Sequence, residues 1–594
     1  MALLMNDDVV GAEAALEGGH SSFHKLAQGV VAFLRASLGF ESEIMREGTS
    51  SERLADAEAS ADRDRRRAQK ENHRHSSYPP GTEFALCHAE AQLMSAVVGV
   101  LSESVVDAMR AFYKLRRAYQ MLEEIQTTSP HQPGMKEDGE KTSDDMSADA
   151  ASRKSASSDL VGDQQKLRRA SIVDSINMDT MQPMDVFIHS GSNMCFGLLL
   201  VILSLIPPSF GRLLSIIGFR GDREKGLSML WVASKADNVH GAIATLALLN
   251  FYGNAIQFCD ILPEEDATSG VGYPTQRCHD VLAIMRQRYP ESALWLLEEA
   301  RMEAVNGHLN AAINLLNVPT SPQMKQVEAL MVFEKAINCM FLHKYQDVAD
   351  SFLKLTELNS WSHALYHYFA AVSYVELYRE NCEKNPDKAR IYGKKAESLL
   401  EATPTFMGKK RFMAQSLPLE VFADRKIKKW QTRAKQRGVP LVDGVGVSPM
   451  EEMMYFWNGY KRMGNDDFAK SLTALDWRKD HLRDDAIDER AIHSLLTSVV
   501  LRNMGELEGA REHLQEVLSI DKFLLKGGLK DDWTAPTAHY EWAVVIWRES
   551  GPKEAADCKL WLQKAARWEA YELDTRVGLR VTTALDTVNK YTEA

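Results

Sequence analysis

The sequence lacks the patterns that mark several classes of disulfide-linked, metal-binding and catalytic proteins. Its seven cysteines are odd in number and scattered, with no CxxC pair and no zinc-ligand spacing, so reduced and buried thiols are expected. No GxSxG elbow, HExxH helix or cysteine with an evident histidine partner is present. We therefore expect no metal, no cofactor and no catalytic residue, and we predict that the protein is not an enzyme. A catalytic site formed by distant residues stays open at this point.

An export signal and an excess of positive charge are also missing. The first residues are acidic where a signal peptide needs basic ones. The net charge of −12 argues against a surface that follows nucleic acid. We expect proteins as partners, no nucleic acid and no small-molecule substrate. The expected location is the cytoplasm, with the nucleus as a second compartment, and the oligomeric state stays open.

A long uninterrupted apolar run is absent as well. The most apolar stretch, 194–206, is thirteen residues long and ends at Pro207 and Pro208, whereas a membrane span needs roughly 20 residues. Extending it to Ile217 would place two prolines and an arginine inside the membrane. We predict a buried helix. The alternative is a membrane-associated protein acting in lipid homeostasis, peripheral or anchored through 195–217, at a lipid droplet or the mitochondrial outer membrane.

Composition divides the chain into three parts. Apolar residues make up 45% and charged residues 26% of the sequence, which is enough for a large core. The segment 127–186 is rich in serine and aspartate and contains no aromatic residue, so we predict a disordered insertion. It separates an N-terminal helical region, 1–126, from a helical array, 187–594. The charged and alanine-rich stretch 48–77 fits either an exposed helix or a linker.

The insertion contains a short basic motif followed by a serine. Arg168 and Arg169 precede Ser171 in the sequence RRAS. Two guanidinium groups on a flexible strand can pair with the acidic groove of a basophilic kinase. Ser171 is therefore a candidate phosphorylation site.

Repeats of tetratricopeptide type are the main signal outside the insertion. Apolar residues recur at three- and four-residue spacing, and turn residues interrupt them every 30 to 40 positions. Each repeat needs a small residue where its two helices cross, a turn residue, and further core residues at fixed offsets. Two windows fit in full, one with Ser498, Gly505, Leu507, Ala510 and Leu514 and the other with Ala300, Gly307, Leu309, Ala312 and Leu316. A third window fits with Ala336, His343, Tyr345 and Phe352, although Val348 replaces its small residue.

Two further windows fit the repeat more weakly. They carry Ala96, Glu103, Val105, Ala108 and Phe112, and Trp547, Gly551, Ala556 and Leu560. A capping helix is expected over 574–591. The matching offsets predict an all-α, tetratricopeptide-like solenoid, with a generic helical bundle as the alternative. A partner would bind in the groove of this solenoid, and Trp361, Tyr366 and Tyr374 are the candidate groove aromatics.

Local motifs point to structural roles. His363 and His367 lie one helical turn apart but lack a third metal ligand, so packing or a surface position is expected. Gly444 and Gly446 predict a loop between repeats. The basic run 425–437 around Trp430 predicts a solvated helix face, and a nuclear import signal or an anionic-lipid contact are its alternatives.

Three segments resemble a known family. They are YPPGTEFALCHAEAQLMSAVVGVL from Tyr78, FYKLRRAY from Phe112, and GSNMCFGLLLVILSLIPPSFGRLLSIIGFRGDREKGLSMLW from Gly191. Together they resemble the fungal inclusion body clearance protein family, which is similar to the animal tetratricopeptide repeat protein 39 group. The resemblance covers the chain from about His20 onward. It implies a non-enzymatic scaffold that binds lipid droplet proteins and helps to clear aggregated protein after folding stress.

Overall fold

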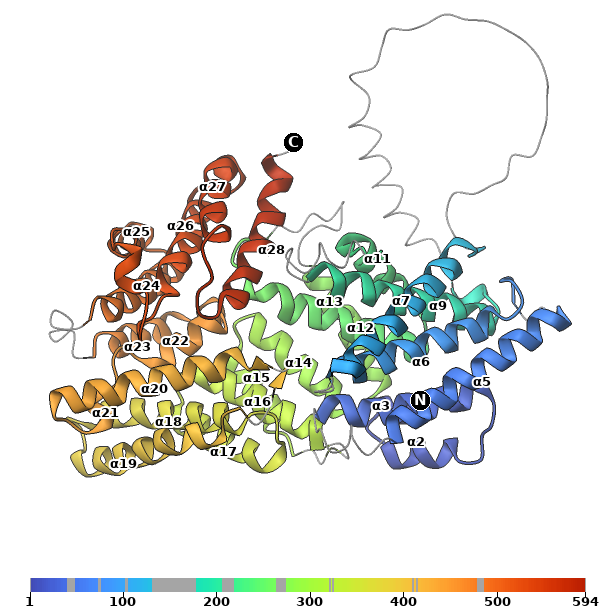
Figure 1. Ribbon diagram of the computed structural model, residues 1–594, viewed down its shortest axis with the longest axis horizontal. Coiled ribbons are helices and arrows are strands. Elements are labelled where there is room, and N and C mark those ends of the chain that lie inside the picture. The colour runs from blue at the N-terminus through green and yellow to red at the C-terminus, as the bar shows by residue number, and fades with distance from the viewer. Residues whose placement is uncertain are drawn as a thin grey trace, which may run out of the picture.

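The computed structural model shows a chain of α-helices stacked as antiparallel pairs (Figure 1). It describes residues 2–39, 49–72, 76–101, 105–130, 178–205, 218–262, 274–319, 322, 325–408, 411–412, 415–477 and 486–592. Within these residues the only strands are β1 (Arg411–Phe412) and β2 (Gln415–Ser416), which pair antiparallel. The prediction of an all-α, tetratricopeptide-like solenoid is confirmed.

The N-terminal helices supply most of one of the two large apolar cores, and the first few of them also pack into other clusters. They are α1 (Ala2–Met5), α2 (Val9–Leu16), α3 (Ser22–Gly39), α5 (Thr49–Glu71), α6 (Thr82–Leu101), α7 (Val105–Thr127), η1 (Met178–Thr180), α9 (Pro183–Leu205), α11 (Arg223–Ala233), α12 (Val239–Asn250), η2 (Phe251–Ala255), η3 (Ile256–Phe258) and α13 (Thr275–Arg288). The charged stretch that fitted either a helix or a linker is thus the helix α5, which buries Leu54, Ala57 and Ala61.

The remaining helices supply most of the second large core and, at the C-terminal end, a smaller third one. They are α14 (Ala293–Val305), α15 (Leu309–Leu316), α16 (Lys325–Phe341), α17 (Tyr345–Leu358), α18 (His363–Asn381), α19 (Pro386–Ala402), η4 (Thr403–Phe406), α20 (Pro418–Arg437), α21 (Leu441–Gly444), α22 (Pro449–Phe456), η5 (Gly459–Arg462), α23 (Asn465–Leu475), α24 (Ile487–Met504), α25 (Leu507–Leu518), η7 (Lys522–Leu525), α26 (Thr534–Ser550), η8 (Gly551–Glu554), α27 (Ala555–Ala566) and α28 (Asp574–Thr592). The predicted capping helix matches α28 to within one residue.

The three well-fitting repeat windows are helical pairs with the predicted turns. Gly505 ends α24 with a left-handed φ of 88°, and Gly307 lies between α14 and α15 at 84°. Ser498 and Ala510, at the crossing of α24 and α25, are 1% and 0% exposed. Small side chains at this crossing let the two helices approach closely, as the pattern requires.

The two weaker windows are also helical pairs, but their predicted core residues are partly wrong. Phe112 is 39% exposed on α7, and Leu560 is 57% exposed on α27. The residues that close these cores are Ala111 and, on α27, Cys558 and Leu562, all 2% exposed or less. Ala556 is exposed as well. A consensus offset places a residue to within one position, and one position turns a side chain by about 100° around a helix.

Helical structure extends into both ends of the predicted insertion. Helix α7 runs to Thr127, η1 begins at Met178, and α9 begins at Pro183, so the second helical part starts before the predicted boundary at 186. Residues 131–177, and with them the candidate phosphorylation site Ser171, lie outside the described residues.

The apolar stretch forms the C-terminal part of α9 and is mostly covered. In the described part of the chain two helical segments are long and apolar enough to cross a membrane, Pro183–Leu205 and Val239–Phe258, but 78% and 56% of their apolar windows are buried inside the protein. The predicted buried helix is therefore found at α9, while the continuation 206–217 lies outside the described residues. All seven cysteines are free thiols, and six of them are buried.

Three glycines after the apolar stretch are required for two different reasons. Gly218 has a φ of 96°, which side chains other than glycine rarely adopt. A Cβ at Gly221 would lie 2.4 Å from the backbone nitrogen of Ser204. A Cβ at Gly226 would lie 2.7 Å from the carbonyl oxygen of Gly197. The last two positions let α11 and the segment before it press directly on the backbone of α9.

Substituting Gly226 by alanine is expected to destabilise the contact between α9 and α11. The added methyl group meets a backbone carbonyl that cannot rotate away, and such overpacking costs roughly 1–3 kcal/mol. Gly578→Ala is the matched control, because Gly578 lies in α28 with no atom within 4 Å of the new Cβ. Urea unfolding followed by circular dichroism should show a lower midpoint for the first variant and an unchanged or higher one for the second.

The C-terminal helices return to the N-terminal half of the chain, as Figure 1 shows for α28. Lys590 of α28 pairs with Glu224 of α11 at 2.8 Å, and Asp586 pairs with Arg223 at 3.1 Å. Cys259 and Ile261, from the segment after η3, are buried among α26, α27 and α28 in a third, smaller core. The two halves of the chain are thus joined by more than the sequential stacking of repeats.

Candidate functional site

The candidate groove aromatics do not line a surface groove. Tyr366 and Tyr374 are 3% and 4% exposed, and Trp361 is half-buried against the same core. The Tyr366 hydroxyl donates to Asn359 Oδ1 at 2.8 Å, and the Tyr374 ring stacks on Tyr392. The prediction for the two tyrosines is wrong, because α18 is covered by α17 and α19 on both sides.

The histidines of the same helix pack as expected. His363 Nε2 lies 3.0 Å from the carbonyl oxygen of Asn359, and His367 stacks on Phe406 with ring centroids 4.3 Å apart. Among the described residues no group of three His, Cys, Asp or Glu side chains is placed to hold a metal ion. Gly444 and Gly446 lie at the connection between α21 and α22, where the loop between repeats was predicted.

The basic run is not a solvated helix face over its whole length. Lys428, Lys435 and Arg437 are exposed on α20. Four others point inward on one face of the helix, at the three- and four-residue spacing that keeps side chains together: Arg425, Lys426, Lys429 and Arg433. Lys426 is only 1% exposed. This inward face carries neither an import signal nor a lipid contact.

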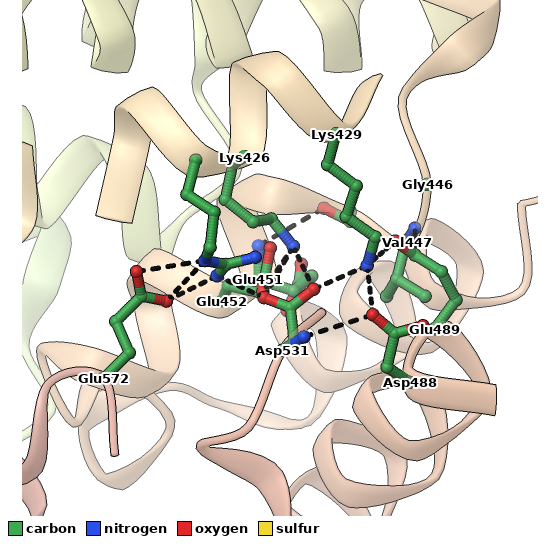
Figure 2. Close-up of polar contacts among 12 residues, drawn as sticks. Lys426, Lys429, Gly446, Val447, Glu451, Glu452, Asp488, Glu489, Asp531 and Glu572 are labelled. Atoms are coloured by element: carbon green, nitrogen blue, oxygen red, sulfur yellow. Dashed lines mark hydrogen bonds and ion pairs between the residues drawn. The ribbon is translucent and has the colours of Figure 1, made fainter. Parts of the chain in front are cut away.

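The inward cations meet five carboxylates from other elements, in what we term the charge cluster. Its acidic members are Glu452, Asp488, Glu489, Asp531 and Glu572. Figure 2 shows Lys426 and Lys429 reaching from their helix toward Asp531 at the centre. Lys429 Nζ lies 2.6 Å from Asp531 Oδ2, and Arg425 Nη2 lies 2.6 Å from Asp531 Oδ1. Asp531 thus joins α20 to the loop that leads into α26.

The loop before α22 is fitted closely to this cluster. Glu489 Oε2 accepts a hydrogen bond from the Val447 backbone at 2.9 Å, and its other oxygen pairs with Lys429 at 2.7 Å. A Cβ at Gly446 would lie 2.0 Å from Glu489 Oε2. The predicted loop glycine is therefore needed for the close approach of a buried carboxylate.

The members of the cluster differ in their tendency to ionise. Burial raises the pKa of Glu452 to about 8, although Lys426 opposes the shift. Burial also raises the pKa of Glu489, but Lys429 and Lys426 outweigh the effect of burial and lower this pKa to about 2. The same balance holds the pKa of Asp531 well below its usual range. At neutral pH Glu452 is therefore mostly protonated, whereas Glu489 and Asp531 are ionised.

A second buried group contains residue types found in hydrolases. His343 Nε2 lies 3.1 Å from both Glu451 Oε1 and Ser471 Oγ. A serine relay needs the base and the orienting carboxylate on different ring nitrogens, so that one nitrogen can take the serine proton. Here both contacts use the same nitrogen, and the His343 and Glu451 side chains are 3% and 0% exposed. This geometry ties α22 and α23 to the turn after α16 and does not activate Ser471.

An exposed apolar stripe on α7 is the surface feature that the sequence did not reveal. Val106, Met109, Phe112 and Tyr113 are 58%, 71%, 39% and 70% exposed. They follow one another along two turns of the helix, and exposed arginines flank them at positions 110, 116 and 117. Their three- and four-residue spacing is the same as that of core residues. We term these four residues the α7 stripe.

The chain matches a known family over most of its length. Residues 1–504 match the family described as Iml2/Tetratricopeptide repeat protein 39. The inclusion body clearance protein iml2 of Aspergillus terreus is 44% identical, over 100% of this chain and 95% of its own. The Yarrowia lipolytica protein of that name is 37% identical over 99% and 92%, and the Sclerotinia sclerotiorum protein is 34% identical over 100% and 94%.

A likeness to a solved structure is much weaker. The crystal structure of the APC/C hetero-tetramer Cut9-Hcn1 contains a chain that aligns over 97% of this one at 9% identity, with a TM-score of 0.24. A TM-score this low does not support a shared fold. Family membership follows instead from the profile match and from the relatives, which agree over nearly the whole sequence. The chain belongs to the Iml2/Tetratricopeptide repeat protein 39 family.

Proposed function

We propose that this protein is a non-enzymatic interaction scaffold that takes part in clearing aggregated protein after folding stress, with lipid droplet proteins among its partners. The relatives support the role, since those at 34–44% identity are called inclusion body clearance proteins. The stacked helical pairs support the scaffold, because solenoids present long surfaces to other proteins. The proposed place of action is the cytoplasm, with the nucleus as a second compartment.

The α7 stripe is the observation that carries this proposal. Four large apolar side chains exposed side by side are costly in water and mark contact sites. Their spacing forms a ridge that fits the groove of another helix. The flanking arginines favour acidic residues on that partner. The proposed occupant is therefore an amphipathic helix of a partner protein with acidic flanks.

Replacing Met109, Phe112 and Tyr113 together by serine tests this surface. The full tagged chain would be recovered from stressed cells, and the co-purified proteins measured. Recovery of lipid droplet proteins is expected to fall by about tenfold or more, because several large apolar contacts are lost at once. Ile391→Ser is the matched control, since Ile391 is a separate apolar residue on α19 that is 54% exposed.

Two results would count against the proposal at different levels. Equal recovery by the triple variant would mean that the α7 stripe is not the contact surface. Recovery of no lipid droplet or aggregate-associated protein by the unaltered chain would remove the proposed function itself.

A membrane-associated role acting in lipid homeostasis is the second candidate. It is favoured by the two apolar helical segments Pro183–Leu205 and Val239–Phe258. Burial of most of the first segment opposes a spanning position, because a helix cannot pack inside the protein and face lipid with the same residues. Alkaline carbonate extraction separates the two cases. Protein that stays in the membrane pellet would favour the membrane-associated role over the scaffold.

A further inference from the structure

A buried cluster of basic residues lies where the C-terminal helices meet the segment after η3. It contains Asp260, Lys461 of η5, Arg502 of α24, Glu541 of α26, and Arg576 and Arg580 of α28. We term it the junction site. Arg502 and Arg580 are 2% and 1% exposed, and Glu541 is 1% exposed. Residues far apart in the sequence are thus brought together at the contact between the two halves of the chain.

The two carboxylates of the junction site are already engaged. Glu541 Oε2 accepts from Arg502 Nε at 3.0 Å, and its other oxygen accepts from the Tyr455 hydroxyl at 2.8 Å. Asp260 Oδ2 accepts from the Tyr540 hydroxyl at 3.0 Å, and Arg502 Nη2 lies 3.4 Å from Asp260 Oδ1. Arg502 and the two tyrosines thus contact both carboxylates directly, while Arg580 acts on Asp260 and Glu541 from farther away.

The other three cations contact neutral groups. Arg580 Nη2 donates to the Tyr455 carbonyl at 2.5 Å, and Arg576 Nη1 donates to the Phe456 carbonyl at 3.0 Å. Lys461 Nζ donates to Gln257 Oε1 at 3.1 Å and to the Cys259 carbonyl at 3.2 Å. Four cations thus face two carboxylates, which leaves an excess of two positive charges. Burial and the neighbouring Arg580 accordingly lower the pKa of Arg576 to about 10.

Two guanidinium nitrogens of the junction site have no hydrogen-bond partner among the described residues. They are Nη1 of Arg502 and Nη1 of Arg580, and both are buried. A buried N–H group of a charged side chain normally has an acceptor, because desolvating it without one is costly. The charge excess and the two unused donors point to the same kind of group, a small anion with several oxygen atoms.

We propose that the junction site binds a phosphate group, held between Arg502 and Arg580 with Lys461 and Arg576 nearby. The forked guanidinium group can donate to two oxygen atoms of a tetrahedral oxyanion at once, which a single-atom ion does not offer. Arg548, which is exposed on α26, lies close enough to Arg502 for the two charges to interact. Because the site exists only in the folded chain, bound phosphate stabilises the folded protein.

The test is a phosphate titration of the full-length protein. Inorganic phosphate is expected to raise the melting temperature in a saturable way, and isothermal titration should give a single site. Chloride at the same ionic strength should not reproduce the rise. O-Phosphoserine distinguishes the source of the phosphate: a rise with both ligands means that the site accepts monoesters, and a rise with phosphate alone means that it takes the free ion.

Two variants decide whether the rise comes from the junction site. Arg580→Lys keeps the charge but loses the fork, and it should weaken phosphate binding by about tenfold. Arg548→Gln, at the exposed rim, should weaken it less while leaving the fold intact. Arg390→Gln is the control, since the Arg390 side chain is 71% exposed on α19. No saturable rise, or the same affinity in both junction variants as in the control, would overturn the proposal.

Discussion

Asp531→Ala is expected to lower the free energy of unfolding of the C-terminal repeats by roughly 3–5 kcal/mol, the cost of breaking a buried ion pair. Asp531 is 0% exposed, and Arg425, Lys426 and Lys429 all reach its carboxylate. Removing it leaves these cations with too few partners in a dry interior. Urea unfolding followed by tryptophan fluorescence reports on this region, because Trp430 and Trp533 are both fully buried.

A matched control exists on the other face of the same helix. Lys428 and Asp424 form an ion pair whose side chains are 59% and 29% exposed. Exposed pairs of this kind contribute under about 1 kcal/mol, so Asp424→Ala should leave the unfolding midpoint almost unchanged. Equal losses in the two variants would show that the charge cluster contributes no more than a surface pair.

Glu452→Gln is expected to reduce the decline in stability between pH 5 and pH 8. Burial raises the pKa of Glu452 to about 8, above the value of about 4.3 in an unfolded chain. Between these values the folded state holds a proton that the unfolded state has released. Stability therefore falls as pH rises, by up to about 1.4 kcal/mol per pH unit from this group.

The difference between the wild type and this variant isolates Glu452 from the rest of the cluster. Asp531 and Glu489 have lowered pKa values, so their contribution is complete above about pH 4 and constant over this range. Urea unfolding at a series of pH values provides the measurement. Glu328→Gln, at a side chain that is 36% exposed, should keep the slope of the wild type. An unchanged slope in Glu452→Gln would mean that Glu452 is ionised in the folded protein.

Sequence patterns predicted the parts of the fold that depend on neighbours in the chain. Gly505 and Ala510 were predicted from offsets within one pair of helices, and the structure places both as expected. The charge cluster depends on distant partners: Arg425 meets Glu572 across 147 residues, and Lys429 meets Asp488 across 59. No local pattern separates such a lysine from a solvated one.

The α7 stripe shows the opposite error. Phe112 was assigned to the core because its spacing is that of a core residue, yet it is 39% exposed. Tyr374 carried the same kind of signal and was assigned to a groove, although it is 4% exposed. Amphipathic spacing indicates that burying the apolar face of a helix is favourable. Whether this chain or another molecule covers it depends on how the pairs stack, and single-sequence spacing does not contain that information.

The return of the last helix to the middle of the chain also affects the timing of synthesis. Thr587 of α28 donates to the carbonyl of Ile261 across 326 residues. At about 5–20 residues per second, the ribosome needs roughly 16–65 s to make that stretch. During this time Ile261 lacks its contact with α28. A slow translation step near the C-terminus would prolong the time for which the apolar surface at Ile261 stays uncovered by α28.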